Sequence, residues 1–182
     1  MDNYIRVYEN AFSDELCDRL INKFESTPVS NRERHDMGEM HFSQVNFRAC
    51  GWKQEQEQLV NIFLSHTKKY TSDLNITSEF PQKYALEDIR LKKYMPDGHD
   101  QFGPHVDVVD KSTSTRFLVF FVYLDDNISG GTHFDKINLT SPCKKGSILI
   151  FPPMRTHLHA GLKPIDKPKY IVGSYLHYVA HD

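Results

Sequence analysis

The chain has 182 residues, with 22 Lys and Arg against 24 Asp and Glu and a formal net charge of −2 at pH 7. This length allows one sizeable hydrophobic core, so we expect a single domain over residues 1–182. No stretch rich in Lys and Arg stands out, so charge favours neither nucleic acid nor an acidic membrane surface as a partner.

The three cysteines are widely spaced along the chain, at Cys17, Cys50 and Cys143. An odd number without any C-x-x-C arrangement argues against a disulfide framework or a zinc knuckle and fits a reducing compartment. The first residues do not show a basic segment followed by an apolar one, and no segment approaches the apolar length of a membrane span. We therefore expect a cytoplasmic protein without a membrane anchor.

Two amphipathic helices are predicted in the first part of the chain. Ser13 is a suitable N-cap, and Asp14 and Glu15 place negative charge in the first turn that follows it. Apolar residues recur at helical spacing in this helix and again in a second one over about residues 52–70. Their apolar stripes are Leu16, Leu20, Ile21 and Phe24, and then Leu59, Ile62, Phe63 and Tyr70.

The polar segment of residues 30–44 lies between these helices and has no clear period. A long irregular segment is often either a solvated loop or a mobile lid over an active site. Both interpretations stay open at this point.

From Tyr84 onward the pattern changes to short extended runs rich in β-branched and aromatic residues, bounded by Gly, Pro, Asp and Asn. Because the helices precede the strands rather than alternating with them, the order favours a mostly antiparallel jelly roll over a doubly wound parallel sheet. Residues 1–80 would supply helical support and residues 84–180 the jelly-roll core. The predicted strands are residues 86–94, 116–124, 131–134, 146–151, 155–162 and 169–179.

Candidate metal ligands follow from the spacing of a few polar side chains. Residues two apart on a strand share a face, so His105 and Asp107 could bind one ion together. Farther along lie His157 and His159, which would also face the same way on a strand, so spacing alone does not separate them. Two imidazoles and one carboxylate that bind one face of an iron ion leave its other coordination positions free for substrates, as in non-haem Fe(II) oxygenases.

Several short motifs surround these residues in a fixed order. They are Tyr94 to Gly98, the His105-Val106-Asp107 triplet, Arg116, Tyr123-Leu124, Gly130 to Phe134, Gly146 to Pro152, His159-Ala160-Gly161 and Lys169. This series, over roughly residues 84–178, resembles the catalytic domain of the prolyl 4-hydroxylase-like branch of the Fe(II)/2-oxoglutarate-dependent dioxygenases.

The resemblance implies a double-stranded β-helix fold in which His105, Asp107 and His159 hold Fe(II). It favours His159 over His157 as the distal ligand, because Ala160-Gly161 follows it as in the family's His-x-Gly pattern. His99, His133 and His177 have no similar context, so surface or packing roles are expected for them.

The same resemblance assigns the cosubstrate pocket. It implies that 2-oxoglutarate chelates the iron while Lys169 binds its far carboxylate, with help from Tyr123, and that Tyr94 lines the pocket. Lysine is seldom fully buried without an opposite charge. If Lys169 points into the barrel, the dicarboxylate would supply that charge. Val119, Phe121 and Ile171 share a face with Tyr123 or Lys169 and would line the interior.

The reaction implied is hydroxylation of an unactivated C–H bond with O2, with ascorbate as a possible aid that keeps the iron reduced. The branch favours a prolyl residue in a peptide or protein as substrate, and a free amino acid or small metabolite is the alternative. A non-enzymatic metal-binding jelly roll would need neither Lys169 nor Tyr123, and a zinc hydrolase would need a general-base carboxylate that the sequence does not show. Arg116 and Arg155 are undecided candidates for the substrate rim.

Overall fold

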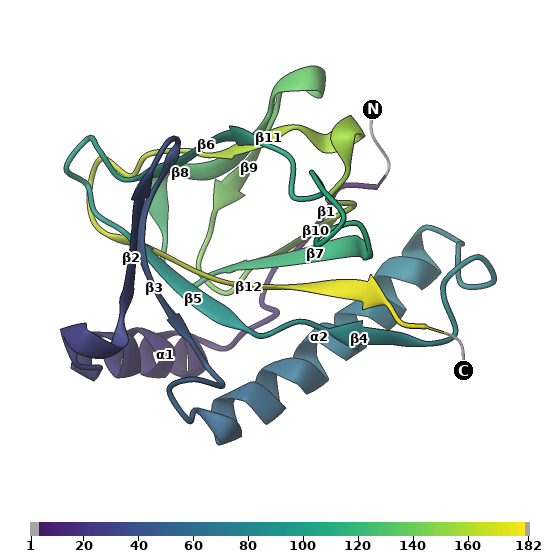
Figure 1. Ribbon diagram of the computed structural model, residues 1–182, viewed down its shortest axis with the longest axis horizontal. Helices are drawn as coiled ribbons and strands as arrows, with labels where there is room; N and C mark the ends of the chain where they lie inside the picture. The colour runs from purple at the N-terminus through teal and green to yellow at the C-terminus, as the bar shows by residue number, and fades with distance from the viewer. Residues whose placement is uncertain (1–3, 181–182) are drawn as a thin grey trace.

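The computed structural model describes residues 4–180, which form a barrel-like antiparallel sheet with two α-helices on one side (Figure 1). The helices are α1 (Asp14–Ser26) and α2 (Lys53–Asp73). The strands are β1 (Arg6–Tyr8), β2 (Glu33–Met37), β3 (Met40–Asn46), β4 (Tyr84–Leu86), β5 (Arg90–Tyr94), β6 (Gln101–His105), β7 (Arg116–Tyr123), β8 (Asn127–Phe134), β9 (Leu139–Cys143), β10 (Ile148–Phe151), β11 (His159–Gly161) and β12 (Lys169–Tyr178). The predicted jelly roll on helical support is confirmed.

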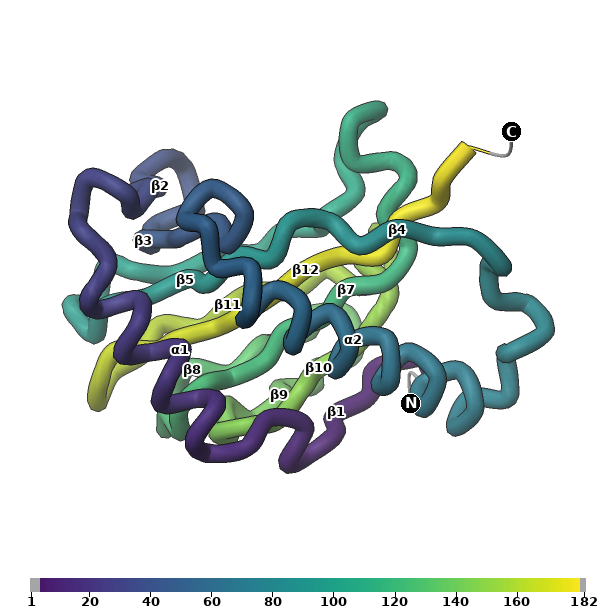
Figure 2. Tube along the Cα trace, turned by 90° about the horizontal axis from the view of Figure 1, so that it is seen from below, coloured from purple at the N-terminus to yellow at the C-terminus, as the bar shows by residue number. Residues whose placement is uncertain are grey.

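Both predicted helices are present. The Ser13 hydroxyl accepts a hydrogen bond from the Leu16 backbone N–H at 3.2 Å and so caps α1. Helix α1 buries one stripe, including Leu20 and Phe24, against the sheet, and α2 does the same with a stripe that includes Phe63. Figure 2 shows both helices lying across the outer face of β5, β12, β7 and β10. None of the helices in residues 4–180 is both long and apolar enough to cross a membrane.

The strand order is β1-β10-β7-β12-β5-β3-β6-β11-β8-β9, with β2 paired to β3 and β4 to β12. All the pairings are antiparallel. Strand β3 pairs with both β5 and β6, so it joins the helix-covered half of the sheet to the opposite half, formed by β6, β11, β8 and β9 (Figure 1).

Side chains of β7 alternate between two apolar cores. Leu118, Phe120 and Val122 pack toward the helices, whereas Val119 and Tyr123 pack inside the barrel. Alternation of this kind is what an extended strand between two packed layers requires. The inner core is the one that supports the site.

Residues 30–44 differ from the sequence-based expectation, because most of them form the β2–β3 hairpin instead of an irregular segment. Gly38, with φ of +59°, lies in the turn between Met37 and Met40, which are paired. Strand β2 is mostly exposed and so lacks the apolar alternation that reveals a strand. Strands also occur before and between the helices, so the expected order of helices first and strands second is wrong.

Strands β6 and β9 were missed as well. Strand β6 contains Gly103 and Pro104, and β9 contains Pro142. Both residue types are unfavourable inside strands, so local preference argues against these assignments. Tertiary pairing with β11 and β8 overrides that preference.

Candidate active site

Three potential metal ligands converge at one end of the inner core. His105 ends β6, Asp107 follows it closely, and His159 begins β11 directly opposite His105. Their donor atoms all lie within 4.8 Å of one another. Asp107 Oδ1 lies 3.5 Å from His105 Nε2, and Asp107 Oδ2 lies 3.5 Å from His159 Nε2.

Backbone carbonyls orient both imidazoles. Nδ1 of His105 donates to the Gly103 carbonyl at 2.7 Å, and Nδ1 of His159 donates to the His157 carbonyl at 2.9 Å. With the proton on Nδ1, each Nε2 presents its lone pair to the centre of the group. Burial lowers the pKa of His159 to about 4, which keeps that ring neutral.

One donor atom of each converging residue has no hydrogen-bond partner within residues 4–180. Nε2 of His105, Oδ2 of Asp107 and Nε2 of His159 are buried and lack any hydrogen-bond partner. Buried polar atoms are normally satisfied, so three unsatisfied acceptors that face one point need an explanation. Two neutral imidazoles and a carboxylate fit a divalent transition metal, which would satisfy all three at once.

A chain of partners orients Asp107, and one of them, Tyr175, was not predicted from the sequence. The Tyr175 hydroxyl donates to Asp107 Oδ1 at 2.7 Å. The Arg116 guanidinium lies 4.1 Å from the centre of the Tyr175 ring, donates to the Asp107 carbonyl at 3.2 Å, and forms a bidentate pair with Glu87. Tyr175 could have been found, since it lies on the same strand face as Lys169, at alternate positions along β12.

His157 is placed differently from the sequence-based expectation. The predicted strand over residues 155–162 is broken by a 3-10 turn, Arg155–His157, before β11 begins. His157 is therefore not on the strand face of His159, and its side chain is buried. Its side chain is outside the group of converging donor atoms, and its carbonyl accepts the hydrogen bond from His159 Nδ1.

Lys169 lies inside the barrel and is 1% exposed. Its ammonium group is 4.4 Å from the centre of the Tyr94 ring and donates to the Leu162 carbonyl at 2.5 Å. No carboxylate of residues 4–180 forms an ion pair with it. Burial accordingly lowers the pKa of Lys169 to about 8. The lysine is a buried cation without a compensating charge.

Tyr94 contacts this lysine, and Tyr123 belongs to the same inner core as Tyr94. Tyr94 is the cross-strand partner of Lys169, and Tyr123 is fully buried with its hydroxyl 2.7 Å from Thr132 Oγ1. A small pocket beside the converging histidines is lined by Tyr94, Thr132, His159 and Gly161, among others. Gly130 gives the lysine its room, because a Cβ there would lie 2.7 Å from Lys169 Cδ.

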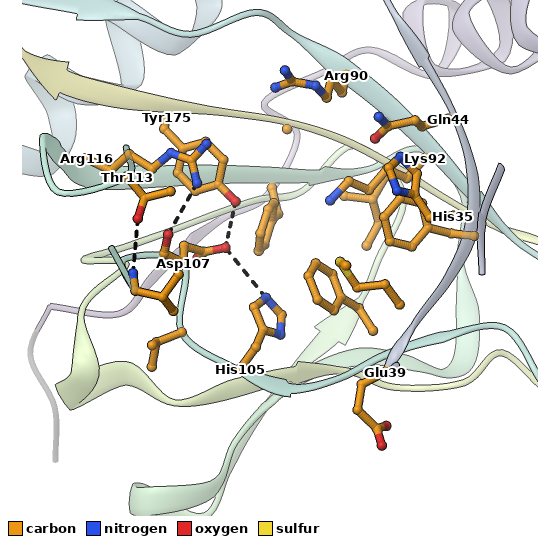
Figure 3. Close-up of a pocket in the computed structure, with 18 residues that line it drawn as sticks. His35, Glu39, Gln44, Arg90, Lys92, His105, Asp107, Thr113, Arg116 and Tyr175 are labelled. Atoms are coloured by element: carbon orange, nitrogen blue, oxygen red, sulfur yellow. Dashed lines mark hydrogen bonds and ion pairs between the residues drawn. The ribbon is translucent and has the colours of Figure 1, made fainter. Parts of the chain in front are cut away.

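A larger cavity of about 520 Å³ opens beside Asp107 (Figure 3). The β2–β3 hairpin supplies part of its wall, together with inward-facing residues of β5, β7 and β12. Arg116 also lines the cavity, but two of its guanidinium nitrogens already donate to Glu87, which leaves fewer donors for a substrate. The lining residues include Glu39, Phe42, Gln44, Arg90, Lys92, Phe102, Phe121, Ile171 and Tyr175.

A second group of possible metal ligands, Asp36, His41 and His99, lies on the surface near this hairpin. His41 and His99 both donate to the same oxygen of Asp36, at 2.5 and 2.9 Å. These bonds lower the pKa of Asp36 to about 2. Unlike the buried group, this one is satisfied by its own ion pairs.

Comparison with known proteins agrees with this geometry. The model of the 2OG-Fe(II) oxygenase superfamily matches residues 89–177, which include all three converging side chains and Lys169. The chain belongs to the 2OG-Fe(II) oxygenase superfamily. Membership in this superfamily implies Fe(II) and 2-oxoglutarate as its cofactor and cosubstrate.

Relatives of this oxygenase act on prolyl or lysyl residues, according to their names. Human procollagen-lysine,2-oxoglutarate 5-dioxygenase 2 is 25% identical over 170 residues, which cover 91% of this chain but 22% of that protein. The viral collagen prolyl hydroxylase of Paramecium bursaria Chlorella virus-1 shares the fold with a TM-score of 0.70, 20% identity and 97% coverage of both chains. A Pseudomonas putida prolyl-4-hydroxylase has a TM-score of 0.69 and 10% identity, over 97% of this chain and 94% of that one.

Proposed function

We propose that this oxygenase hydroxylates an unactivated C–H bond, with His105, Asp107 and His159 as the ligands of Fe(II). The convergence of three buried acceptor atoms without hydrogen-bond partners carries this proposal. The histidine tautomers and the bond from Tyr175 to Asp107 support it, because they orient the donor set before any metal binds.

Fe(II) and 2-oxoglutarate supply the activation of O2, in which one oxygen atom enters the substrate and the other enters succinate as CO2 is released. Lys169 binds the far carboxylate of 2-oxoglutarate, because that anion compensates a lysine otherwise buried without a counter-charge. Tyr123 adds a hydroxyl beside this carboxylate, and Tyr94 forms a wall of the pocket.

The chain's apolar residues keep water away from the reacting carbon. Phe102 stacks on the His105 ring at 3.6 Å between centroids, and Phe121 and Ile171 complete the wall between the two cavities. A dry, shaped cavity limits side reactions of the activated oxygen and fixes the substrate.

For the substrate, we propose a prolyl residue in a peptide or protein. The names of the relatives support a peptidyl substrate. The cavity also supports such a substrate, because its volume of about 520 Å³ could admit a segment of a peptide. A free amino acid or small metabolite is the alternative that would fit the same chemistry.

The test measures succinate formed from 2-oxoglutarate with Fe(II), ascorbate and air, together with a mass-spectrometric search for one added oxygen atom in peptides. We expect succinate from the native protein and none from Asp107→Ala, with the added oxygen on prolyl residues. Equal succinate from both proteins would contradict the iron site. Oxygen added only to free amino acids would contradict the peptidyl substrate.

A further inference from the structure

Lys92 places a second ammonium group in the active-site cavity. It lies on β5 two residues before Tyr94, so both side chains face the barrel interior, and its cross-strand partners are Gln44 and Ile171. It lines both the large cavity and the small pocket beside His159. Figure 3 shows its side chain extending into the space on the Asp107 side of β5.

No acidic side chain in the described part of the chain forms an ion pair with Lys92. Within residues 4–180 it forms no hydrogen bond and no ion pair, and its ammonium group lies 4.7 and 5.1 Å from the centres of the Phe42 and Phe102 rings. Ring faces attract a cation but do not neutralise it. Burial is the main cause that lowers the pKa of Lys92 to about 8; Asp107 opposes this shift, while Arg90 and Arg116 add to it.

The acids that face the cavity are already engaged. Asp107 accepts the Tyr175 hydroxyl and belongs to the converging metal ligands. Glu39 is exposed, accepts from Gln101 at 3.0 Å, and turns its carboxylate away from the cavity in Figure 3. Lys92 therefore lacks a counter-charge that the protein itself could provide.

Arg90 extends this positive region toward the mouth. It lies on the same face of β5, two residues before Lys92, and its one hydrogen bond within residues 4–180 is a 3.3 Å contact with the Asp88 carbonyl. Binding of Fe(II) and 2-oxoglutarate would not change this imbalance. The two charges of the iron and the charge of Lys169 are matched by Asp107 and the dicarboxylate, so Lys92 and Arg90 would still lack anions.

We propose that Lys92, assisted by Arg90, binds a carboxylate of the prime substrate, so that this oxygenase hydroxylates a carbon close to an acidic group. The inference rests on the proposed function and adds a substrate class to it. The carboxylate could belong to an Asp or Glu side chain beside the target residue, or to the α-carboxyl group of a C-terminal or free amino acid. Both sources present the same anion to the ammonium group.

The experiment uses two pairs of probe pools with the full chain loaded with 2-oxoglutarate and Mn(II), which holds the site without turnover. One pair consists of capped peptides with a central proline, flanked by Asp and Glu in one pool and by Asn and Gln in the other. The second pair consists of peptides that end in proline, as free acid or as amide. Retention on the immobilised protein is read by mass spectrometry, and turnover is read separately with Fe(II).

We expect the native protein to retain the acidic member of at least one pair about 10-fold to 100-fold better than its neutral partner, as for a buried charge-assisted hydrogen bond. Which pair responds identifies the source of the carboxylate. Lys92→Met should lose this preference and Lys92→Arg should keep it. Lys83→Met removes an equal charge from an exposed position and should behave as the native protein.

Equal retention of both members of each pair by the native protein, or no retention at all, would overturn the proposal. A preference that persists in Lys92→Met would overturn it too, as would weaker binding of 2-oxoglutarate instead of acidic peptide in that variant. Thermal unfolding of each variant checks that it is folded. If Lys92→Met does not fold, Lys92→Arg still tests whether a positive charge at this position is sufficient for the preference. Failure of the proposed function is distinct, because succinate would then be absent in the native protein as well.

Discussion

Tyr175 shows how the site is built from single hydrogen bonds outside the three donor side chains. Its hydroxyl fixes one oxygen of Asp107, and Arg116 in turn covers the Tyr175 ring. The other carboxylate oxygen remains directed at His159. Such outer partners orient metal ligands and therefore affect metal affinity.

We predict that Tyr175→Phe weakens Fe(II) binding by about 10-fold to 100-fold, because Asp107 loses the bond that orients it. Competition with a chelator of known affinity measures the change. Tyr178→Phe is the matched control, since Tyr178 lies on the same strand but is half exposed. An unchanged affinity in Tyr175→Phe would mean that Asp107 is oriented without Tyr175.

Lys169→Ala should sharply weaken 2-oxoglutarate binding, because the far carboxylate loses its cationic partner. The metal should stay in place, because Lys169 is not one of the three proposed metal ligands. Calorimetric titration of 2-oxoglutarate into Mn(II)-loaded protein measures the first effect and metal analysis the second. Unaltered affinity for 2-oxoglutarate would refute the assignment of Lys169.

The same lysine predicts a pH dependence. The free protein holds Lys169 with a pKa of about 8, and a bound dicarboxylate favours the charged form and so raises that pKa. Binding therefore takes up a proton above about pH 8, and affinity for 2-oxoglutarate should fall by up to about tenfold per pH unit there while staying constant well below it. Titrations across this range check the profile. In Lys169→Arg the side chain stays charged, so the affinity for 2-oxoglutarate should not fall above about pH 8. The same pH profile of affinity in this variant and in the native protein would contradict the prediction.

At the scale of elements, one buried acid anchors β2, the outer strand of the β2–β3 hairpin, to the barrel. Asp100, 1% exposed, receives two bonds from Arg34 of the hairpin, at 2.7 and 3.1 Å, and one from the Met95 backbone. This pairing keeps the hairpin in place as a wall of the large cavity.

Arg34→Ala should therefore loosen the hairpin and cost about 1–3 kcal/mol, because it leaves a buried acceptor without its charged partner. We expect faster hydrogen exchange in residues 33–46 and a higher KM for a peptide substrate. Arg48→Ala, which removes a largely exposed arginine, is the control. If exchange in the hairpin were the same in both variants, the Asp100 pairing would not be what holds it.

At the scale of the whole molecule, the helices stabilise the sheet from the side opposite the site. The Phe63 ring of α2 stacks on Phe120 of β7 with centroids 5.0 Å apart, and both residues are fully buried. The next residue of β7, Phe121, faces the barrel interior and lines the cavity, so the same strand contacts both the helices and the site.

Phe63→Ala should lower the free energy of unfolding by about 3–5 kcal/mol, since it removes a ring from a closely packed core. Denaturant unfolding measures this, and Val29→Ala, at an exposed position, should change it little. A loss below about 1 kcal/mol in Phe63→Ala would show that the helices contribute little to the barrel.

Local signals and the order of motifs are enough to predict the fold class and the superfamily. Two local signals are the helical spacing of apolar residues from Leu16 to Phe24 and the strand-like composition after Tyr84. Because such patterns reflect which side chains of an element are buried, they predict a helix or a strand without knowledge of the segment against which it packs. The order of motifs from Tyr94 to Lys169 led to the superfamily, and both conclusions are confirmed. The roles of His105, Asp107 and His159 as iron ligands stay a prediction, although the structure brings them together.

The other features of the site depend on pairing between distant segments, so they become visible only in the folded chain. The turn before β11 separated His157 from His159, and pairing with β3 and β11 made strands of segments that contain Gly and Pro. Whether Lys92 has a counter-charge is likewise invisible in a sequence, since any of its acidic residues could have approached it. Charge compensation is a property of distances in three dimensions, and those distances exist only once the barrel has closed.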